Sequence, residues 1–567
     1  MWDVLSARLG SLRALRDNLR EAPERVRTSA RLGRQSGLMW SLTTPGLMAL
    51  FRVFTSGSQN PSQIYRIHAK NSPSKPALIW RGRSTSFAEL DERIDRVSGG
   101  LVRRGIDRKK SIILMMRNRQ ELVEVGAAAA RVGAAAVAIS WRSTPSELVY
   151  LATHSGARGI VIEEELLHVL EAVKDALPAV FLENVFVVDG DGVASSVPTT
   201  PYDALVEEPA PKVAPNLGLD DEAAVVIYTS GTTGKPKGAV RKFPKDVMQA
   251  AFCFINETPL RVDDVHLVTC PLYHSTAFGF MSFAHMLGQT VVLMDEFKPE
   301  SFLELVDRYG VTTSAMVPTM LHRVMELPLE TRKKYDARTL RAIFSGGAPL
   351  PAAVAIDFMD MFGDVLFNFY GATETGLVTL AKPADLRAAP GTIGKALPMN
   401  EIRLIGEDGL DVAEGAVGEL YVKNKMLVSG YHDDEEATKQ SMLGGFFSVG
   451  DLARRDVSGH YFIEGRKRDM VISGGVNVYP AEVEGVLEQY PGVREVAVVG
   501  VPDREWGERV RAFVVMKSGA AADEGALELF ARDRLAGPKV PRDFVFIESL
   551  PRNPTGKVLK RELRGMA

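Results

Sequence analysis

The sequence predicts an α/β protein with more than one domain, and three observations support that prediction. The chain has 567 residues, which is too long for a single hydrophobic core. From about Pro61 to Ala223 helical and strand patterns alternate, as they do in a doubly wound α/β layer. Residues 223–227 are apolar and rich in β-branched types, so they predict a buried strand, and a glycine-rich loop follows directly.

Local patterns predict the elements of the alternating region in order. Ser86, with Glu89 three residues later, predicts a capping box at the start of a helix. The apolar run 111–116 predicts a buried strand, and the alanine-rich stretch 121–137 predicts a closely packed helix. Two further strands are predicted at 159–162 and 184–188. These elements form a scaffold and carry no chemistry by themselves.

The composition excludes several classes of function. Hydrophobic residues make up 46% and charged residues 25%, which is ordinary for a globular protein, and a net charge of −3 gives no overall attraction to nucleic acid. Cys253 and Cys270 cannot form a disulfide framework, and no C-x-x-C metal pattern occurs. We therefore expect a reducing, cytoplasmic location and no nucleic-acid partner.

Residues 1–60 form an N-terminal extension of different character. Trp2 and five leucines recur at three- and four-residue steps, which places them on one helical face, and arginines occupy the other faces. The apolar run 38–54 is interrupted by Pro45 and Gly46 and is too short to span a membrane. Two interpretations stay open: helices packed on the body of the protein, or a basic amphipathic anchor in residues 1–54. The anchor would place the protein peripherally on the inner face of the membrane.

The loop from Tyr228 to Ala239 is a candidate phosphate site. It contains three glycines, five hydroxyls and two lysines, so its backbone and side chains can turn many donors and positive charge toward one point. It is not a Walker A loop, because Gly231 and Gly234 are only three residues apart. The candidate ligands of a polyphosphate are Thr229, Ser230, Gly231, Thr232, Thr233, Gly234 and Lys235.

This loop resembles the phosphate-binding signature of the adenylate-forming superfamily, which includes acyl-CoA synthetases, peptide-synthetase adenylation domains and firefly luciferase. The resemblance extends over nearly all of residues 61–567. It implies a large N-terminal adenylation domain of several α/β subdomains at 61–465 and a small, mobile α+β C-terminal domain at 466–567. It also implies ATP and Mg²⁺, with coenzyme A as co-substrate.

Two later motifs resemble the nucleotide-binding parts of the family. The turn Gly347-Ala348-Pro349 is similar to the turn that closes over adenine. In the run from Asn368 to Gly376, the resemblance implies that Tyr370 stacks on adenine, Thr373 contacts the α-phosphate and Glu374 holds Mg²⁺. A carboxylate beside a phosphate site also implies a cation on charge grounds. Asn368 and Gly371 belong to the same nucleotide-binding set.

The motif Phe447-Ser-Val-Gly-Asp-Leu452 resembles the family's ribose-binding motif. The resemblance implies that Asp451 grips both ribose hydroxyls and that Arg466 lies near the ribose. Val449 departs from the threonine that the family usually has, and this departure leaves Asp451 intact.

The C-terminal hundred residues carry the mobile part of the resemblance. Arg468 is similar to the hinge residue between the two domains. Ser473, Gly474 and Gly475 are implied to line the path of coenzyme A, and the run 471–484 predicts a glycine-bent hairpin followed by a helix near Pro480. Lys557, in Pro-Arg-Asn-Pro-Thr-Gly-Lys, is similar to the family's catalytic lysine. The implied catalytic set is Lys557, Thr229, Glu374 and His274.

The predicted acyl-pocket residues begin just after a predicted strand that ends near Cys270. His274 follows it, and the resemblance implies that this histidine lies beside the carboxylate being activated. Relatives that take α-amino acids carry an aspartate here for the substrate ammonium, so His274 disfavours a free amino acid. Small residues leave room for an extended apolar substrate, and the pocket set is His274, Ser275, Ala277, Gly346 and Gly371.

The sequence therefore predicts an AMP-forming acyl-CoA synthetase acting through an acyl-adenylate. The apolar, basic N-terminus favours a medium- to very-long-chain fatty acid as substrate. A separate carrier protein as acceptor, and an aromatic or sterol-side-chain acid as substrate, stay open. A luciferase-like oxidase and a non-enzymatic nucleotide- or lipid-binding protein are disfavoured because the reactive residues are all present. The oligomeric state is open, a homodimer included.

Overall fold

The computed structural model describes most of the chain. The described residues are 31–56, 60–190, 195–207, 225–229, 237–241, 245–372, 374–424, 427, 439, 441–552 and 558–566. No helix within these ranges is long and apolar enough to cross a bilayer. Two compact units divide the chain, the first built from residues 1–228, 240–296 and 308–314 and the second from residues 229–239, 297–307 and 315–567.

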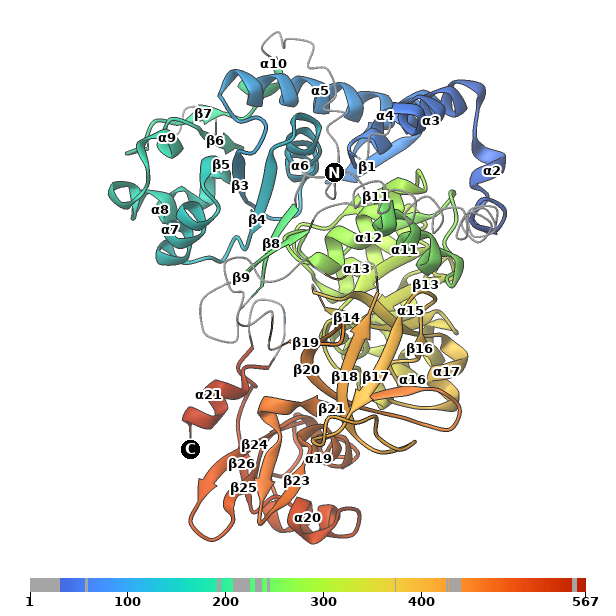
Figure 1. Ribbon diagram of the computed structural model, residues 1–567, viewed down its shortest axis with the longest axis vertical. Helices are drawn as coiled ribbons and strands as arrows, with labels where there is room; N and C mark the ends of the chain where they lie inside the picture. The colour runs from blue at the N-terminus through green and yellow to red at the C-terminus, as the bar shows by residue number, and fades with distance from the viewer. Residues whose placement is uncertain are drawn as a thin grey trace, which may run out of the picture. The chain divides into compact units, whose positions relative to one another are not determined.

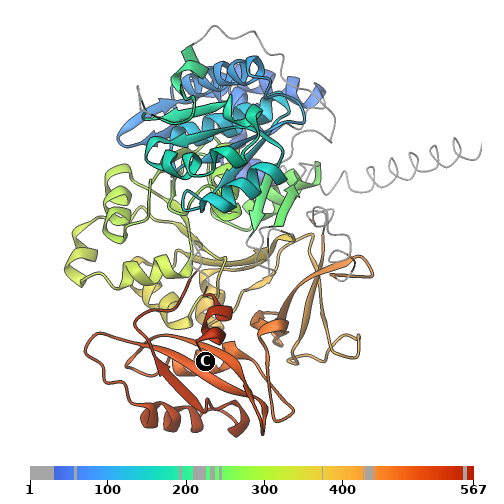
Figure 2. The same ribbon diagram turned by 90° about the vertical axis from the view of Figure 1, so that its left-hand side faces the viewer.

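The first unit contains a five-stranded parallel sheet in the order β4-β3-β5-β6-β7. Helices α5 and α6 lie on one side of the sheet, while α7, α8 and α9 pack on the other against the buried face of Ile113, Val137 and Ile160 (Figures 1 and 2). The doubly wound α/β layer is thereby confirmed. The bounds are α5 Phe87–Arg103, β3 Ser111–Met115, α6 Gln120–Val132, β4 Ala135–Ile139, α7 Pro145–His154, β5 Ala157–Glu163, α8 Leu167–Glu171, α9 Ala179–Leu182, β6 Val185–Val188, β7 Thr200–Pro201 and α10 Asp203–Glu207.

The capping box at α5 is confirmed, and the predicted end of the next helix is wrong. Glu89 N donates to Ser86 Oγ at 3.3 Å, and Ser86 N donates to the Glu89 carboxylate at 2.8 Å. The alanine-rich helix ends at Val132 and not at 137, because Gly133 adopts φ 77° and caps it. The alanines after this glycine form β4, which pairs in parallel with β3. Alanine fits both conformations, so composition alone did not separate them.

A second set of strands in the first unit pairs in the order β10-β11-β1-β2. β10 and β11 are parallel to each other and to β1, and β2 is antiparallel. The bounds are α4 Gln63–Asn71, β1 Pro76–Trp80, β2 Arg83–Ser86, α11 Lys245–Asn256, β10 Val265–Val268, α12 Ser275–Met286 and β11 Thr290–Leu293. The strand predicted at 223–227 is present as β8 Val225–Thr229, and it pairs with β9 Lys237–Arg241.

Three histidines are buried side by side with a tyrosine in this part of the unit. Tyr65 Oη lies 3.1 Å from His285 Nδ1, and His68 Nε2 donates to the carbonyl of Met286 at 3.2 Å. Burial lowers the pKa of His68 and of His285 to about 4 and the pKa of His266 to about 3. All three imidazoles are therefore neutral in the folded protein at physiological pH.

We expect stability to fall as pH drops from 6.5 toward 4. Unfolded histidines titrate near 6.5, so below that pH the unfolded chain binds more protons than the folded one, and the stability present above pH 6.5 is lost progressively. At pH 5 the loss is about 2 kcal/mol for each histidine and about 6 kcal/mol for the three together. Urea unfolding at pH 7.5, 6 and 5 measures it. His285→Gln should flatten the pH dependence, whereas the exposed His168→Gln should not; equal slopes in both variants would refute the assignment.

The second unit begins with strands in the order β13-β14-β15-β16, flanked by helices. β13 and β14 run parallel, and β14 returns antiparallel through a tight turn into β15. The bounds are α13 Pro299–Tyr309, β12 Thr313–Met316, α14 Pro318–Met325, α15 Leu329–Lys334, β13 Ala342–Ser345, α16 Ala352–Phe362, β14 Leu366–Ala372, β15 Gly376–Ala381, α17 Pro383–Ala388 and β16 Lys395–Ala396.

Two smaller antiparallel-rich sheets complete the second unit. The first has the order β17-β18-β20-β19 with β21 paired to β20, and the second has the order β23-β22-β25-β24 with β26 paired to β25. Val471, Val498 and Leu527 belong to the core of the latter, which is α+β in character as predicted. The bounds are β17 Glu401–Ile405, β18 Gly418–Lys423, β19 Met442–Leu443, β20 Phe446–Arg455, β21 Tyr461–Arg466, β22 Val471–Ser473, β23 Val476–Val478, α19 Pro480–Leu487, β24 Val493–Asp503, β25 Gly507–Met516, α20 Glu524–Arg532, β26 Asp543–Phe546 and α21 Lys560–Gly565.

The described part of the N-terminal extension forms α2 Leu38–Ser41 and α3 Thr44–Ser56, and α3 packs along α4. Leu32 and Gly46 are buried, whereas Trp40 and Phe51 are exposed. The segment therefore contacts the body of the protein on one side and presents apolar side chains on the other. The predicted amphipathic helix over the first twenty residues lies outside the described residues.

Candidate active site

Three of the predicted nucleotide-binding side chains meet at one point of the second unit. Tyr370 lies on β14, Asp451 on β20 and Arg466 at the end of β21. The pairing of β20 with β21 places Asp451 directly opposite Arg466. Tyr370 Oη donates to Asp451 Oδ2 at 2.7 Å, and Arg466 Nε lies 3.1 Å from Asp451 Oδ1. The structure thus brings together residues that are 81 and 96 positions apart from Tyr370 in the chain.

The electrostatics of this cluster keep Tyr370 a neutral phenol. Burial, and then the negative charge of Asp451, raise the pKa of Tyr370 well above its ordinary value of 10. The phenol therefore serves as a hydrogen-bond donor to the carboxylate. A carboxylate has about four acceptor positions, and Tyr370 and Arg466 use one on each oxygen of Asp451. One position on each oxygen is left, which matches the two adjacent hydroxyls of a ribose.

The predicted adenine turn follows β13 and is shaped by two glycines. A Cβ on Gly346 would lie 2.5 Å from the ring of Phe369, so only glycine fits there. Gly347 adopts φ 81°, a conformation that favours glycine. Ala348 is half-buried and Pro349 is exposed, so the turn presents its backbone on the surface of the unit. Gly346 thus has a packing reason for its identity in addition to its predicted place in the acyl pocket.

The turn between β14 and β15 carries the predicted cation ligand. A Cβ on Gly371 would lie 2.1 Å from the carbonyl oxygen of Gly376, which explains this glycine by the closeness of the two strands. Glu374 is half-buried at the tip of the turn, and Ala372 N donates to Thr375 Oγ1 at 3.1 Å beneath it. Thr373 lies outside the described residues.

The donor set at this turn fits Mg²⁺ held mainly by phosphate. Within the part of the chain that the structure describes, no three His, Cys, Asp or Glu side chains form a ready-made metal cluster. Mg²⁺ typically takes one or two protein carboxylates and fills its other positions with phosphate oxygens and water. Glu374 alone, beside a nucleotide, meets that requirement.

Asn368 is buried at the centre of β14 and has a structural contact. Its amide donates to the carbonyl of Thr392 at 3.0 Å, and its side chain is 3% exposed. This bond ties β14 to the loop that precedes β16. The amide therefore supports the strand from which Tyr370 projects two residues later.

The predicted acyl-pocket residues of the first unit stand at the start of α12. His274 is the N-cap residue of this helix, and its ring lies 4.2 Å from the ring of Tyr273. Ser275 is half-buried and Ala277 is fully buried. A Cβ placed on Gly279 would have no neighbour within 4 Å among the described residues, so this face of the helix has free space beside it.

The predicted coenzyme A hairpin is confirmed as a structural element. β22 and β23 pair with Ser473 opposite Val476, and Gly474 and Gly475 form a two-residue turn with φ 58° and 79°. Positive φ at both central positions is the requirement of a type I′ turn. The helix that follows begins at Pro480, as predicted.

Trp506 supports this hairpin, and sequence reasoning missed it. Gly474 N donates to the carbonyl of Trp506 at 2.9 Å, and a Cβ on Gly474 would lie 2.6 Å from the indole ring. The guanidinium of Arg542 lies 4.2 Å from the centre of the same ring. Trp506 is 32 residues from Gly474, and no local pattern links the two.

The predicted hinge residue lies in a short helical turn, Lys467–Asp469, between β21 and β22. Burial, and then the neighbouring charge of Arg466, lower the pKa of Arg468. Two ion pairs fix the residues on each side of it: Lys467 with Glu419 at 2.8 Å, and Asp469 with Arg564 at 3.0 Å.

The lysine motif is anchored at one end to the C-terminal sheet, through β24, and at the other end to helix α19. Arg552 pairs with Glu495 at 3.0 Å, and Lys560 pairs with Glu484 at 2.7 Å. Arg552 and Val558 form an antiparallel bridge. Lys557 itself lies outside the described residues, as do residues 230–236 of the glycine loop; for Thr229 only the backbone, at the end of β8, is described.

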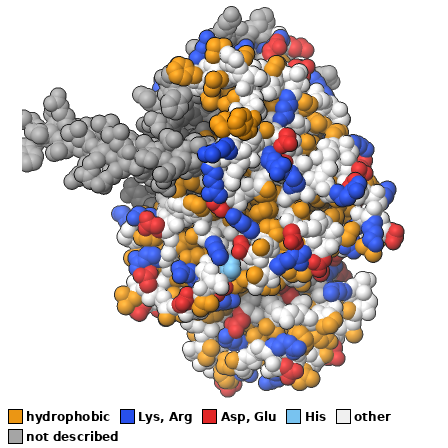
Figure 3. Space-filling view, turned by 90° about the vertical axis from the view of Figure 1, so that its right-hand side faces the viewer, with side chains coloured by type: hydrophobic (Ala, Val, Ile, Leu, Met, Phe, Trp, Pro, Cys, Tyr) orange, Lys and Arg blue, Asp and Glu red, His pale blue; other side chains and the backbone are white. Residues whose placement is uncertain are grey.

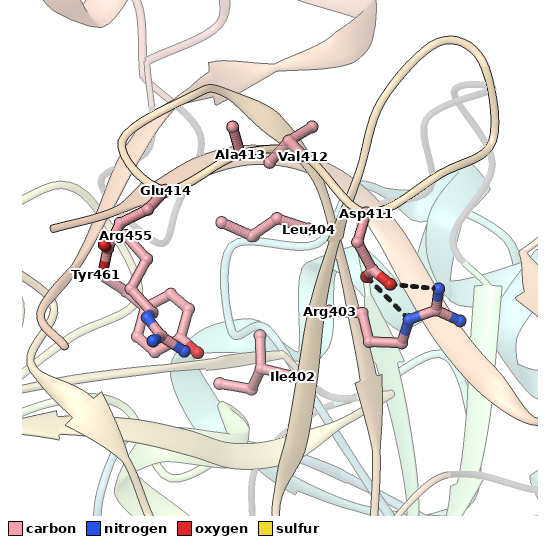
Figure 4. A pocket seen from close by; sticks show the side chains of 9 residues that line it. All are labelled: Ile402, Arg403, Leu404, Asp411, Val412, Ala413, Glu414, Arg455 and Tyr461. Atoms are coloured by element: carbon pink, nitrogen blue, oxygen red, sulfur yellow. Dashed lines mark hydrogen bonds and ion pairs between the residues drawn. The ribbon is translucent and has the colours of Figure 1, made fainter. Parts of the chain in front are cut away.

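A pocket of about 390 Å³ opens beside β17 (Figure 4). Ile402, Leu404 and Val412 project into it, and an ion pair between Arg403 and Asp411 closes one side. None of the predicted site residues lines it. Its lining also includes Arg455, Glu414 and Tyr461. Because it contains none of the motif residues, we place the candidate active site at Asp451 and not here.

Two family descriptions match this chain. The AMP-binding enzyme family matches residues 65–432, and the AMP-binding enzyme C-terminal domain matches residues 482–557. These segments contain Tyr370, Glu374 and Lys557, and Asp451 and Arg466 lie between them in the chain.

Similar proteins are ligases that act on different acids. Indoleacetate–CoA ligase of Aromatoleum aromaticum is 32% identical over 510 residues, covering 88% of this chain and 96% of that protein. The fatty acid–[acyl-carrier-protein] ligase ScoC of Streptomyces coeruleorubidus is 31% identical over 509 residues, covering 88% and 95%. The anthranilate CoA ligase AuaEII, solved in complex with anthranoyl-AMP, has a TM-score of 0.82 at 25% identity, covering 90% and 97%.

The fold, the Tyr370–Asp451–Arg466 cluster and these similarities agree. The predicted cofactors are confirmed, because adenylate-forming CoA ligases use ATP, Mg²⁺ and coenzyme A. The chain belongs to the AMP-binding enzyme family of the adenylate-forming superfamily and is an AMP-forming acid–CoA ligase.

Proposed function

We propose that the acid is apolar, a medium- to very-long-chain fatty acid, activated as its acyl-adenylate and then transferred to coenzyme A. The observation that carries the proposal is the stretch 265–294, which leads into and through α12. It contains no Asp, Glu, Lys or Arg. A substrate ammonium or second carboxylate placed along it would find no charged partner, and burying an unpaired charge is costly.

The start of α12 supports an extended acyl chain. Among the described residues, the space beside Gly279 is open and leaves room along that face of the helix. His274 at the N-cap is placed to approach the carboxylate end. Phe280 and Phe283 pack edge-to-face with ring centres 5.7 Å apart, which gives the helix an apolar interior side. These contacts favour an aliphatic chain over a charged or strongly polar acid.

We assign the nucleotide roles to the residues of the second unit. Asp451 accepts the ribose hydroxyls on its two remaining acceptor positions, and Arg466 holds the carboxylate in place. Tyr370 lies against the adenine, and its hydroxyl orients Asp451. The backbone of Gly346–Pro349 covers the purine. Thr373 and residues 229–235 grip the phosphates.

The first half-reaction joins two anions, the carboxylate and the α-phosphate, so its barrier is mainly electrostatic. Lys557 supplies positive charge at the phosphoryl oxygens, and Glu374 holds the cation. Mg²⁺, when bound, neutralises charge on the phosphates. His274 keeps the carboxylate facing the phosphorus. Acyl-adenylate and pyrophosphate are the products.

The second half-reaction is assigned to a rotation of the C-terminal domain, residues 466–567, about Arg468. This rotation withdraws Lys557 and brings the Ser473–Val476 hairpin to the acyl-adenylate. Gly475 has no neighbour within 4 Å of a would-be Cβ among the described residues, so the pantetheine arm could pass close to its backbone. Attack of the thiolate then releases AMP.

The similarity to ScoC favours a second candidate, transfer of a fatty acyl group to a separate carrier protein. The similarity to indoleacetate–CoA ligase likewise keeps an aromatic acid as a candidate substrate. Both alternatives share the first half-reaction and differ only in acid or acceptor.

A panel of acids assayed by pyrophosphate release tests the proposal. Saturated fatty acids of 8 to about 24 carbons, indoleacetate, anthranilate and a bile acid are compared, each with coenzyme A and with a phosphopantetheinylated carrier protein. We expect kcat/KM at least tenfold higher for fatty acids of 12 or more carbons than for the aromatic acids, because each buried CH₂ contributes about 0.8 kcal/mol. A preference for an aromatic acid, or AMP release only with the carrier, would replace this assignment by the corresponding alternative.

A further inference from the structure

The surface formed by α2 and α3 is unusually apolar for a solvent-facing helix pair. We call Met39, Trp40, Leu47, Met48, Leu50 and Phe51 the α2–α3 patch. The described residues include fifteen exposed large hydrophobic side chains, and six of them belong to this patch, within thirteen consecutive positions. Trp40 is 78% exposed and Phe51 is 66% exposed. A cluster of this kind marks an interaction surface, whereas single exposed apolar residues need no explanation.

The patch is held outward by a specific clamp. Thr43 N donates to Asn71 Oδ1 at 2.8 Å, and Asn71 Nδ2 donates to the carbonyl of Ser41 at 3.1 Å. Asn71 is 6% exposed and ends α4, so it fixes the link between α2 and α3. A Cβ on Gly46 would lie only 2.2 Å from Asn71 Oδ1, which brings α3 tightly against α4 on that side. The opposite side, with Leu47 and Phe51, is therefore fixed facing solvent.

The stretch of the chain that carries the patch has charge of one sign, and one of its arginines, Arg31, lies 3.9 Å from Glu257. Residues 25–88 contain no Asp or Glu and ten basic residues, a charge of +10; since the whole chain carries −3, the remainder carries −13. Arg34 and Arg52 are exposed and flank the patch in the chain. Figure 3 views the side on which Figure 1 places α2 and α3, and its upper part shows hydrophobic side chains beside Lys or Arg side chains, with some Asp or Glu side chains among them. The ten are Arg25, Arg27, Arg31, Arg34, Arg52, Arg66, Lys70, Lys75, Arg81 and Arg83.

We propose that the α2–α3 patch docks on an anionic lipid surface, with Trp40 and Phe51 inserted at the level of the headgroups and Arg34 and Arg52 facing the lipid phosphates. Apolar side chains that enter the interface, surrounded by arginines that meet anionic headgroups, are the combination that holds an interfacial helix. α3 spans 13 residues, which is too short to cross a bilayer and long enough to lie on one.

Charge decides against the other occupants. A second copy of the chain would bring the same basic surface to itself in a two-fold arrangement, so like charges would face each other. Residues 1–30 of the same chain carry six arginines and four acidic residues, a net charge of +2, and would also meet a surface of their own sign. An anionic surface is the partner that complements both the apolar and the charged side chains. This proposal rests on no residue of the active site.

Vesicle flotation of the full-length protein tests the docking. The probes are vesicles of phosphatidylcholine alone and of phosphatidylcholine with 30% phosphatidylglycerol. We expect binding to the anionic vesicles to exceed binding to the neutral ones at least tenfold at 0.1 M NaCl, and to weaken at least fivefold at 0.5 M because the Debye length shortens. Trp40→Ser/Phe51→Ser should lower the partition coefficient at least tenfold, because the two largest apolar contacts are lost.

Matched variants separate the patch from general surface effects. Leu410→Ser/Leu529→Ser removes two other exposed leucines, 66% and 64% exposed, and should change the partition coefficient less than twofold. Arg34→Glu/Arg52→Glu keeps the apolar patch and should abolish the preference for anionic vesicles. This variant tests the docking independently if Trp40→Ser/Phe51→Ser fails to fold. Adenylation of a short, water-soluble acid without vesicles should be unchanged in all of them, so failure of docking is distinguishable from failure of the proposed function.

Four outcomes would overturn the proposal. Full-length protein could show no excess binding to anionic vesicles. Trp40→Ser/Phe51→Ser could bind as well as the parent, which would assign binding to residues 1–30. Removal of residues 1–30 could create binding that the full chain lacks, which would show that these residues cover the patch. A concentration-dependent dimer lost in Trp40→Ser/Phe51→Ser, without vesicle binding, would assign the patch to a second copy.

Discussion

Replacing Lys557 with alanine is expected to lower the rate of acyl-adenylate formation by about 10²- to 10³-fold and to leave thioester formation from supplied acyl-adenylate within a few-fold of the parent. The physical reason is that negative charge develops on the α-phosphoryl oxygens only in the first half-reaction. One well-placed cationic donor there contributes about 3–4 kcal/mol to the transition state. In the second half-reaction the C-terminal domain has turned, and the same lysine no longer faces the phosphorus.

Two assays separate the half-reactions. Pyrophosphate release in single turnover measures the first, and AMP release from chemically prepared acyl-adenylate plus coenzyme A measures the second. Lys517→Ala, an exposed lysine of the same C-terminal sheet region, is the matched control and should affect neither. Arg552 and Lys560 anchor the motif on both sides, so Lys557→Ala should leave the thermal midpoint unchanged. Equal loss of both half-reactions would contradict the division of labour proposed for this lysine.

Asp451→Asn is expected to raise the KM for ATP by about 10- to 100-fold. Hydrogen bonds to a charged partner contribute about 1.5–3 kcal/mol, and the carboxylate makes such bonds to Tyr370, to Arg466 and, by proposal, to two ribose hydroxyls. Asparagine keeps the volume but replaces one acceptor oxygen by an amide NH2 group, a donor that faces either Arg466 or the Tyr370 hydroxyl unfavourably. The negative charge that compensates Arg466 is also lost.

Steady-state kinetics at saturating acid measures the effect, with Tyr370→Phe as the graded comparison. Phenylalanine keeps the ring and removes only the 2.7 Å bond to Asp451, so we expect its KM for ATP to rise by about three- to tenfold. The KM for the acid should change little in either variant. An unchanged KM for ATP in Asp451→Asn, with the protein folded, would show that the ribose is bound elsewhere.

Much of the scaffold could be predicted because its signals are local. The capping box at Ser86 depends on residues three positions apart, and the hairpin at Gly474–Gly475 depends on two adjacent glycines. The prediction was wrong where local signals conflict. The alanines on both sides of Gly133 are compatible with helix and with strand. Those after Gly133 form β4 because they pair with β3.

Contacts between distant residues could not be predicted in this way. Nothing near Gly474 in the chain indicates that Trp506 lies under it, and nothing near Thr43 indicates Asn71 as the clamp of the α2–α3 patch. The apolar and basic N-terminal pattern left two interpretations open. The structure shows both features. The α2–α3 segment contacts α4 on one side and exposes Trp40 and Phe51 on the other, because Asn71 fixes which face of the segment turns inward.

The sequence by itself determined the family and the chemistry, because the glycine loop, the Tyr370–Glu374 run, Asp451 and Lys557 are short motifs whose residue types follow directly from binding ATP. Only the tertiary structure decided that Tyr370, Asp451 and Arg466 meet at one carboxylate, because strand pairing between β20 and β21 and the position of β14 set those distances. The tertiary structure likewise decided which apolar side chains of the N-terminal segment face solvent. Residue types within short sequence motifs indicate the chemistry of the site. The distances between side chains and their exposure depend on packing between segments that are far apart in the chain.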